Sequence, residues 1–256
     1  MKITYIHHSS FLVELETMTL LFDYTEGILP EIKKEKPLFV FASHRHGDHY
    51  SPKILERFED FKAIRYILSD DISIKQMPVQ TGKQTGNQTR DHITFMKPGV
   101  KRNFGITQES IFEMESKDGI ADIEIQTFRS TDEGVAFTIK AEGKVIYHAG
   151  DLNNWRWEGE PEDWNLSMAK QYSEEVDKVK GLEIDVAFLP LDPRQEDAFY
   201  LGFDEFMKKI HVCLAFPMHC WGDFSVINRL KSMEVSKPYK DRIMNIQEDG
   251  QSFIIK

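Results

Sequence analysis

The fold is decided by the stretch Leu38-Phe39-Val40-Phe41-Ala42-Ser43-His44-Arg45-His46-Gly47-Asp48-His49, in which an apolar run ends where three histidines and an aspartate begin. A continuous apolar run of this length is typical of a strand buried on both faces rather than of a helix. Crowded imidazoles are costly, because protonated rings repel one another and neutral rings need hydrogen-bond partners. A bound metal ion removes that cost. The stretch therefore predicts a buried strand that leads directly into a metal-binding loop.

The histidine loop can divide its ligands between two ions. His44 and His46 are one residue apart, so their side chains can point the same way, whereas Asp48 and His49 come from the next turn. Imidazole nitrogens and carboxylate oxygens, without thiolate, favour zinc, manganese or iron. The alternative is a polar, helix-capping loop that is rich in histidine by chance, and the density of the motif disfavours it.

Composition sets the limits on class and partners. The 256 residues are 41% hydrophobic, enough for a sizeable core, and we find no composition break, so we expect a single domain over residues 1–256. The net charge of -10 is spread along the chain and would repel nucleic acid.

The pattern of apolar residues and cysteines bears on location. No apolar leader follows Met1, and no apolar run approaches the roughly 18 residues that suggest a membrane span. Cys213 and Cys220 are too few for a disulfide framework or a cysteine-only zinc site. We therefore expect a cytoplasmic protein without a membrane span; no pattern indicates an oligomeric state.

Strand-like stretches dominate the first half of the chain, and strands alternate with helices in the second half. Such an order predicts two sheets packed face to face with helices outside, an α/β (α+β) fold. The expected strands are a meander over Lys2–Ile6, Ser10–Leu15 and Thr19–Phe22, further strands at Ala63–Leu68 and His92–Met96, a hairpin over Gly134–Ile139 and Lys144–Tyr147, strands at Asp185–Leu189 and Val212–Phe216, and terminal strands near Ile243 and Phe253. The expected helices are one capped by Ser51-Pro52 and ending at Phe58, and others over Pro161–Lys180, Asp204–Ile210 and Phe224–Met233. A surface loop and candidate lid is expected at Gln76–Arg90.

Several motifs together resemble the metallo-β-lactamase-fold hydrolase superfamily. They are the H-x-H-x-D-H pattern after an apolar strand, Gly150-Asp151 after the strand Lys144–Tyr147, and His219 after the apolar run Cys213–Met218. His7-His8-Ser9-Ser10 with the downstream Phe22-Asp23 further resembles the lactonase-like branch, which contains ascorbate-6-phosphate lactonase and phospholipase-D-type members. The resemblance implies a four-layer αββα sandwich with a dinuclear metal site at one edge of the sheets.

The resemblance also implies a ligand set. It assigns His44 and His46 to the first ion, Asp48, His49 and His219 to the second, and Asp151 to a bridge between them. Asp151 has a reason of its own, since it follows Ala149-Gly150 at a strand end, where no bulk keeps an ion away.

One departure from the family pattern concerns the first ion. The superfamily usually supplies a histidine where this chain has Arg129-Ser130-Thr131-Asp132-Glu133-Gly134. Either Asp132 or Glu133 substitutes as an oxygen ligand, which would favour manganese or iron over zinc, or both are ordinary turn residues and the site is more open. His148 is either a compensating ligand, or a residue that supports a ligand, or a packed core residue.

Residues near the expected centre suggest the mechanism and the substrate. A water between two ions loses a proton near neutral pH and attacks a carbonyl or phosphoryl centre, with Asp48 placed to orient it or accept its proton. Trp155 and Arg156 follow Asp151 and either bind an anionic or cyclic molecule or serve in packing. Arg194 either clamps an anion or pairs with Asp192, and His8 either supports a metal ligand or belongs to a polar turn.

The first hypothesis is therefore a metal-dependent hydrolase with two divalent ions, acting on a small, anionic ester, lactone or phosphate ester. The second is a non-catalytic or weakly active metal-binding protein of the same fold, suggested by the missing histidine. A metal-dependent nuclease is a poorer third, since no basic, aromatic-interleaved groove is visible in the sequence.

Overall fold

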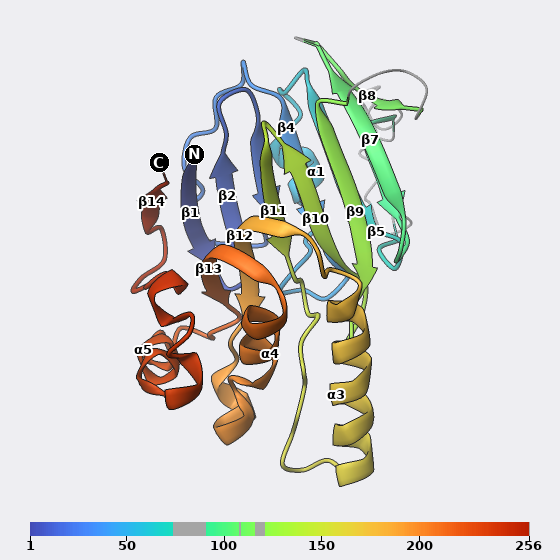
Figure 1. Ribbon diagram of the computed structural model, residues 1–256. Helices are drawn as coiled ribbons and strands as arrows, with labels where there is room; N and C mark the ends of the chain where they lie inside the picture. The colour runs from blue at the N-terminus through green and yellow to red at the C-terminus, as the bar shows by residue number, and fades with distance from the viewer. Residues whose placement is uncertain (74–90, 108, 116–120, 256) are drawn as a thin grey trace.

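The computed structural model of the chain describes residues 1–73, 91–107, 109–115 and 121–255 (Figure 1). The loop predicted at Gln76–Arg90 lies outside the described residues. Within them, one mixed sheet has the order β14 (Ser252–Ile254), β1 (Lys2–His7), β2 (Ser10–Glu14), β3 (Thr19–Phe22), β4 (Leu38–Ala42), β5 (Ile64–Ser69) and β6 (Ile93–Met96). The second sheet has the order β13 (His211–Met218), β12 (Glu183–Pro190), β11 (Lys144–His148), β10 (Val135–Ala141), β9 (Ile123–Arg129), β7 (Lys101–Ile106) and β8 (Ile111–Met114).

The first sheet is apolar on both faces, as the run Leu38–Ala42 predicts. Because side chains alternate along a strand, Phe39 and Phe41 join the core between the sheets, whereas Leu38 and Val40 pack on the other face. That outer face is covered by the short helix α1 (Ile54–Arg57).

The second sheet is likewise covered on both faces. His148 of β11 stacks on Phe22 of the first sheet, with ring centroids 5.0 Å apart, while its neighbour Tyr147 stacks on Phe206 of α4 (Leu201–Lys209) at 4.7 Å. Helix α4 packs beside α3 (Glu162–Asp177), and Tyr172 of α3 donates a 2.7 Å hydrogen bond to the carbonyl of Gly202 (Figure 1). The order helix, sheet, sheet, helix confirms the predicted αββα sandwich.

The remaining elements follow β12 along the chain. They are η2 (Pro193–Ala198), α5 (Ser225–Ser232), η3 (Glu234–Ser236) and η4 (Lys240–Arg242). Among the described residues, no helix has both the length and the apolar character needed to cross a membrane.

Two local predictions are wrong. Ser51 and Pro52 do not cap a helix, because α1 begins at Ile54 with Lys53 before it and without a side-chain capping bond. The strand expected near Ile243 is a single bridge to Ala215, because the neighbouring residues form the 3-10 turn η4 instead of extending. The strand expected near Phe253 is present as β14.

Candidate metal centre

The candidate centre lies where the ends of strands from both sheets meet. Parallel and antiparallel pairing brings the carboxyl ends of six strands to this edge, and each is followed by a polar side chain. These are His8 after β1, Asp23 after β3, the loop 43–49 after β4, Asp151 after β11, Asp192 after β12 and His219 after β13. The turn between β9 and β10 adds Asp132 and Glu133.

The backbone is strained around this edge. His8, Asp23 and His219 adopt positive φ angles of 52°, 42° and 61°, a conformation that costs free energy for any residue with a Cβ. At Gly134, with φ +71°, a Cβ would collide with the carbonyl oxygen of Ser43. Glycine there lets the β9–β10 turn approach the histidine loop closely.

Four side chains, His8, Asp48, His49 and His219, bring one ligand atom each to a common point; we call them the second ligand group. The Nε2 atom of His8 lies 3.3 Å from Asp48 Oδ2. The Nε2 atoms of His49 and His219 lie 3.2 and 3.5 Å from Asp151 Oδ1, close enough for ion pairs but without hydrogen-bond geometry. All three nitrogens and Asp151 Oδ1 are buried without a hydrogen-bond partner. Buried polar atoms are rarely left so, and a cation would satisfy all four.

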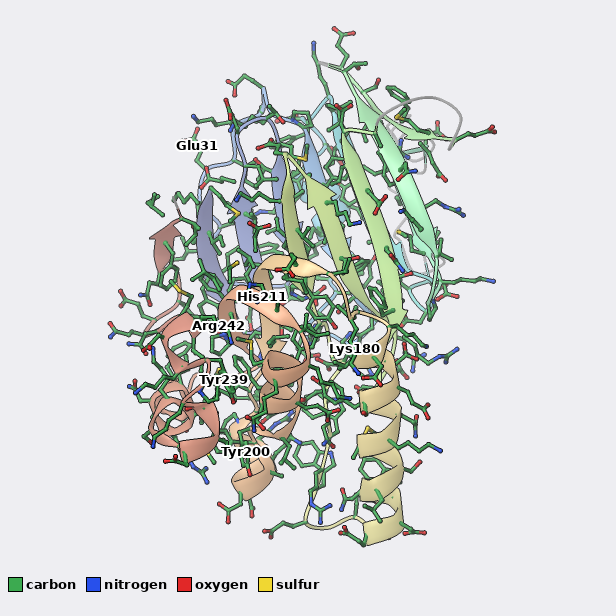
Figure 2. All side chains as sticks on the ribbon, in the orientation of Figure 1. Glu31, Lys180, Tyr200, His211, Tyr239 and Arg242 are labelled. Atoms are coloured by element: carbon green, nitrogen blue, oxygen red, sulfur yellow. The ribbon has the colours of Figure 1, made fainter. Side chains whose placement is uncertain are left out.

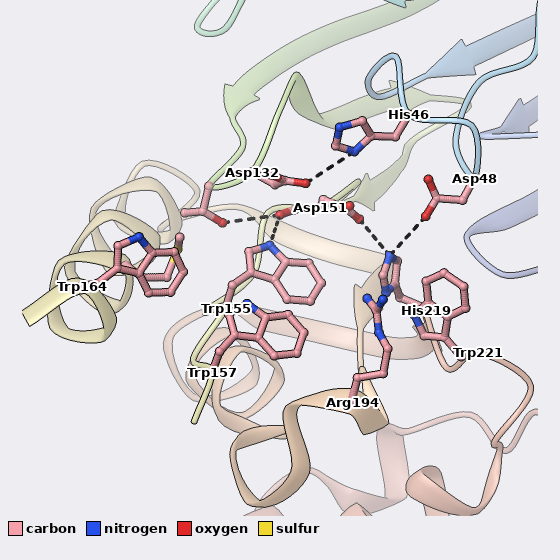
Figure 3. Close-up of a pocket in the computed structure, with 12 residues that line it drawn as sticks. His46, Asp48, Asp132, Asp151, Trp155, Trp157, Trp164, Arg194, His219 and Trp221 are labelled. Carbon is pink, nitrogen blue, oxygen red and sulfur yellow. Dashed lines mark hydrogen bonds and ion pairs between the residues drawn. The ribbon is translucent and has the colours of Figure 1, made fainter. Parts of the chain in front are cut away.

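The first ligand group consists of His44, His46, Asp132 and Asp151. His44 Nε2 lies 3.0 Å from His46 Nδ1 and 3.5 Å from Asp151 Oδ2, and His46 Nδ1 lies 3.6 Å from Asp132 Oδ2. Asp151 therefore turns one oxygen toward each group, the arrangement that a bridging carboxylate requires (Figure 3).

Two buried carboxylates fix the direction of two candidate ligand imidazoles. His49 Nδ1 donates to Asp23 at 2.7 Å, and His219 Nδ1 donates to Asp192 at 2.9 Å, so that each Nε2 faces the centre. Asp23 also accepts from the backbone and hydroxyl of Ser43, at 2.7 and 2.6 Å. Sequence reasoning did not assign these roles; the position of both aspartates directly after a strand was the available signal.

The charges of the centre suit cation binding. Burial, together with the neighbouring His49, lowers the pKa of His44 to about 4, so this ring is neutral at pH 7. Burial disfavours a charged His49, but the carboxylates of Asp151 and Asp23 outweigh it and raise the pKa of His49 well above its ordinary value. Without an ion, a proton on His49 thus balances carboxylate charge that a cation would otherwise balance.

The residues proposed to replace the missing histidine differ in placement. Asp132 joins the first ligand group, whereas Glu133 forms an ion pair with Arg45 and lies 3.4 Å from His46 Nε2. His148 is not placed to ligate, which corrects one of the options for it. Its Nε2 bonds the carbonyl of Ser9 at 3.0 Å, and its Nδ1 accepts from the backbone of Gly150 at 3.1 Å.

A cavity of about 410 Å³ opens beside both ligand groups (Figure 3). Trp155 and Arg194, both expected near a substrate, line it. Arg156, also expected near a substrate, does not line this cavity. It forms an ion pair with Glu162 of α3 at 2.6 Å and lines a separate hollow. His211, at the opposite end of β13 from His219, is exposed and lies 3.4 Å from Glu183 (Figure 2).

Comparison with known proteins identifies the family. A family model described as "Beta-lactamase superfamily domain" matches residues 2–160, more than half of the chain. The chain belongs to the β-lactamase superfamily. The matched part contains both ligand groups except His219, which lies further along the chain.

Relatives of this superfamily member carry hydrolase names. The chain is 26% identical over 263 residues to a UPF0173 metal-dependent hydrolase of Alkaliphilus metalliredigens, covering 97% of this chain and 98% of that one. A UPF0173 metal-dependent hydrolase of Opitutus terrae is 25% identical over 230 residues, covering 86% and 84%. With this membership and these relatives, the chain stands among the metal-dependent hydrolases.

The fold also matches a solved structure. Igni18, a metallo hydrolase from Ignicoccus hospitalis, superposes with a TM-score of 0.56 and 18% sequence identity, covering 100% of this chain and 99% of that chain. At this identity the likeness shows the fold alone.

Proposed function

We propose that the chain is a dinuclear metal-dependent hydrolase whose substrate is a small, anionic ester, lactone or phosphate ester. One observation carries the proposal: the buried, unpartnered nitrogens of the second ligand group lie on the Oδ1 side of the Asp151 carboxylate, and the first ligand group lies on its Oδ2 side. Unpaired polar atoms in a low-dielectric interior cost several kcal/mol unless an ion or water satisfies them.

The donor atoms suit zinc, manganese or iron. In our proposal His44, His46 and Asp132 hold the first ion, the second ligand group holds the second, and Asp151 lies between them. All of these donors are nitrogen or oxygen atoms. Cys220, next to His219, is fully buried, and burial raises the pKa of its thiol, so it stays a protonated core residue.

The chain's own side chains orient the reactants. Two ions bound here would make a water nucleophilic near neutral pH and stabilise the negative charge that develops on the substrate. Burial opposes ionisation of Asp48, but the neighbouring His8 and His49 outweigh it and lower its pKa, so its carboxylate can accept a hydrogen bond from the attacking water. Trp155 holds the Asp151 backbone by donating to its carbonyl at 2.8 Å.

The cavity and the resemblance support the proposed size and class of the substrate. About 410 Å³ suits a small molecule and is far too small for a polymer. The resemblance to the lactonase-like branch supports a lactone or ester as the hydrolysed group, in which the water oxygen bonds to the carbonyl carbon as the ring or ester oxygen leaves. Both cysteines are free, which suits a reducing compartment such as the cytoplasm.

Metal analysis tests the centre itself. Protein purified without chelators and then supplied with manganese or zinc should hold about two ions per chain. Asp151→Asn should lose ions from both groups, whereas Asp197→Asn, which changes an exposed carboxylate on η2, should retain them. Fewer than one ion per chain, with no gain on adding metal, would remove the proposal.

Turnover tests catalysis. With 4-nitrophenyl acetate, γ-butyrolactone and bis(4-nitrophenyl) phosphate as probes, we expect wild type to hydrolyse at least one, and Asp151→Asn to lose at least about 100-fold in kcat/KM. If the protein binds two ions but wild type and Asp151→Asn are equally active, the activity comes from a contaminant and the non-catalytic metal-binding hypothesis replaces this one.

A further inference from the structure

All four tryptophans of the chain line the cavity beside the metal centre. Trp155 and Trp157 lie in the segment that follows Asp151, Trp164 lies on α3, and Trp221 lies two residues beyond His219 (Figure 3). Segments far apart in the sequence therefore bring every indole to one small volume. The proposed hydrolytic chemistry uses only the indole N–H of Trp155, which donates to the Asp151 carbonyl, and leaves the aromatic surface of the four rings without a role.

The indoles add aromatic surface to the wall of the cavity. The rings of Trp155 and Trp157 are parallel, with an interplanar angle of 3° and centroids 5.9 Å apart, and Trp155 meets the ligand His219 edge-on at 5.4 Å. Trp164 and Trp221 keep 38% and 49% of their surface exposed although they are large and apolar. Exposed aromatic surface at the mouth of a cavity is typical of a ligand site.

Arg194 adds a cation to this aromatic wall. Its guanidinium carbon lies 4.2 Å from the ring centroid of Trp221 and 5.8 Å from that of Trp157. Its Nε and Nη2 donate to Asp192, at 2.6 to 3.0 Å, while Nη1 has no hydrogen-bond partner in the described part of the chain. The guanidinium is therefore held rigidly by Asp192 with one nitrogen left for a ligand.

We propose that this cavity recognises a planar aromatic molecule with a carboxylate, its ring against the tryptophans and its carboxylate at Arg194. The inference rests on the proposed function and names its substrate class: aromatic carboxylates whose ester or lactone bond lies toward Asp151. Stacking on indole rewards a flat ring over a puckered aliphatic one of similar size. A carboxylate would be tolerated once two divalent ions are bound, because their charge would outweigh that of Asp48, Asp132 and Asp151, which line the same cavity.

Intrinsic tryptophan fluorescence reports binding directly, since every tryptophan of the chain lines the cavity. We would titrate the zinc-loaded protein with benzoate, benzamide and cyclohexanecarboxylate. Benzoate should shift or quench the emission at concentrations about tenfold lower than either of the others, because only benzoate has both the ring and the charge. If benzoate and cyclohexanecarboxylate bound equally well, recognition of an aromatic ring would be overturned. If benzoate and benzamide bound equally well, recognition of a carboxylate would be overturned.

Variants assign the carboxylate contact to a residue. Arg194→Gln should abolish the preference for benzoate over benzamide, and Arg194→Lys should restore part of it. Arg229→Gln is the matched control, because Arg229 also lies over an aromatic ring, Phe199 at 4.3 Å, and pairs with an aspartate, but outside the cavity. Retention of the preference in Arg194→Gln with a normal zinc content would overturn the assignment to Arg194.

Failure of aromatic carboxylate binding can be told apart from failure of the proposed hydrolase function. Zinc content is measured for every sample, so failure to bind zinc counts against the hydrolase proposal alone. Benzamide and cyclohexanecarboxamide, both neutral, are then compared in metal-free protein, where the aromatic compound should still bind more tightly. A protein that binds two ions and hydrolyses simple esters, yet shows no aromatic preference, would retain the proposed function and lose this inference.

Discussion

Two adjacent histidines, His7 and His8, have opposite surroundings. His8 is 6% exposed and turns its unpartnered Nε2 toward Asp48, whereas His7 is partly exposed and bonds Asp249 through Nδ1 at 2.7 Å. We predict that His8→Gln lowers the affinity of the second ligand group for its ion by at least about tenfold, because the ion loses one of its few ligands. His7→Gln should leave the affinity unchanged. Competition titration with a metal-indicator dye measures both, and equal effects would show that His8 is not a ligand.

Asp132 places a carboxylate oxygen in the first ligand group, where the resemblance to the superfamily implies a histidine. Oxygen ligands favour manganese and iron, and imidazole favours zinc. Asp132→His should therefore shift the first group's preference toward zinc, raising the ratio of zinc to manganese affinity by about tenfold or more. Glu133→Gln, a change in the neighbouring residue outside both ligand groups, is the control. Metal content after dialysis against an equal mixture of the two ions gives the ratio; an unchanged ratio would argue against ligation by Asp132.

At the residue scale, the sequence predicts which candidate ligands lie close together when those residues are neighbours in the chain. His44, His46, Asp48 and His49 follow one strand, so their proximity follows from local geometry alone, and the structure brings their side chains together. The place of His8 beside Asp48 depends on how β1 is aligned with β4 through two intervening strands, which a single sequence does not encode visibly. For the same reason the hydrogen bonds of Asp23 and Asp192 to the ligand histidines could not be foreseen.

Among the elements, the β10–β11 hairpin is tied to the first sheet at the end opposite the metal centre. Glu142 in its turn accepts hydrogen bonds from the backbone of Glu16 and Thr17, at 2.8 and 2.7 Å, and from the Thr17 hydroxyl. Burial opposes the ionised form of Glu142, but these hydrogen bonds outweigh it and lower its pKa. The contacts join the β2–β3 turn to the β10–β11 turn and therefore bridge the two sheets.

The lowered pKa of Glu142 predicts a pH-dependent contribution to stability. The contribution is fully present above the unfolded pKa, about 4.3, and is lost as pH falls through the lower folded value. We expect Glu142→Gln to reduce the free energy of unfolding by about 1 kcal/mol at pH 7, a modest figure because the group is exposed. The difference from wild type should shrink on acidification below about pH 4. Urea unfolding measures it, with Glu16→Gln as control; a difference that is constant with pH would contradict the assignment.

The positions of strands and helices were predictable where the pattern of apolar residues extends over several residues, and they were not predictable where that pattern is short. The strands β1 to β5 and the hairpin alternate or run apolar over several residues, so their expected bounds agree with the structure to within a residue or two. Near Ile243 the apolar signal is only a few residues long, and helix α1 is a single turn, so packing rather than local pattern decides both. The extent of the cavity depends on α3 and the segment before it, whose placement no periodicity reveals.

For the whole molecule, the candidate metal centre joins the two sheets. The first ligand group takes His44 from the end of β4 and Asp151 from the end of β11, and the second takes His8 from β1 and His219 from β13. The chain end is held as well, because β14 pairs with β1 and the two termini lie side by side (Figure 1). That residues 1–256 fold as one domain stays a prediction, for which a single unfolding transition would be the sign.

Bound ions should therefore stabilise the entire chain. Ligands that bind only the folded state add RT ln(1 + [L]/Kd), about 2.7 kcal/mol for each site at a free concentration 100 times Kd. For a protein of this size, each kcal/mol raises Tm by roughly 2 to 4 °C, so zinc should raise the Tm of chelator-treated protein by at least about 5 °C. Calorimetry with and without zinc measures the shift. Asp197→Asn should retain it, and Asp151→Asn should lose most of it, because its carboxylate faces both groups. An equal shift in Asp151→Asn would mean that zinc stabilises the chain from somewhere other than the two ligand groups.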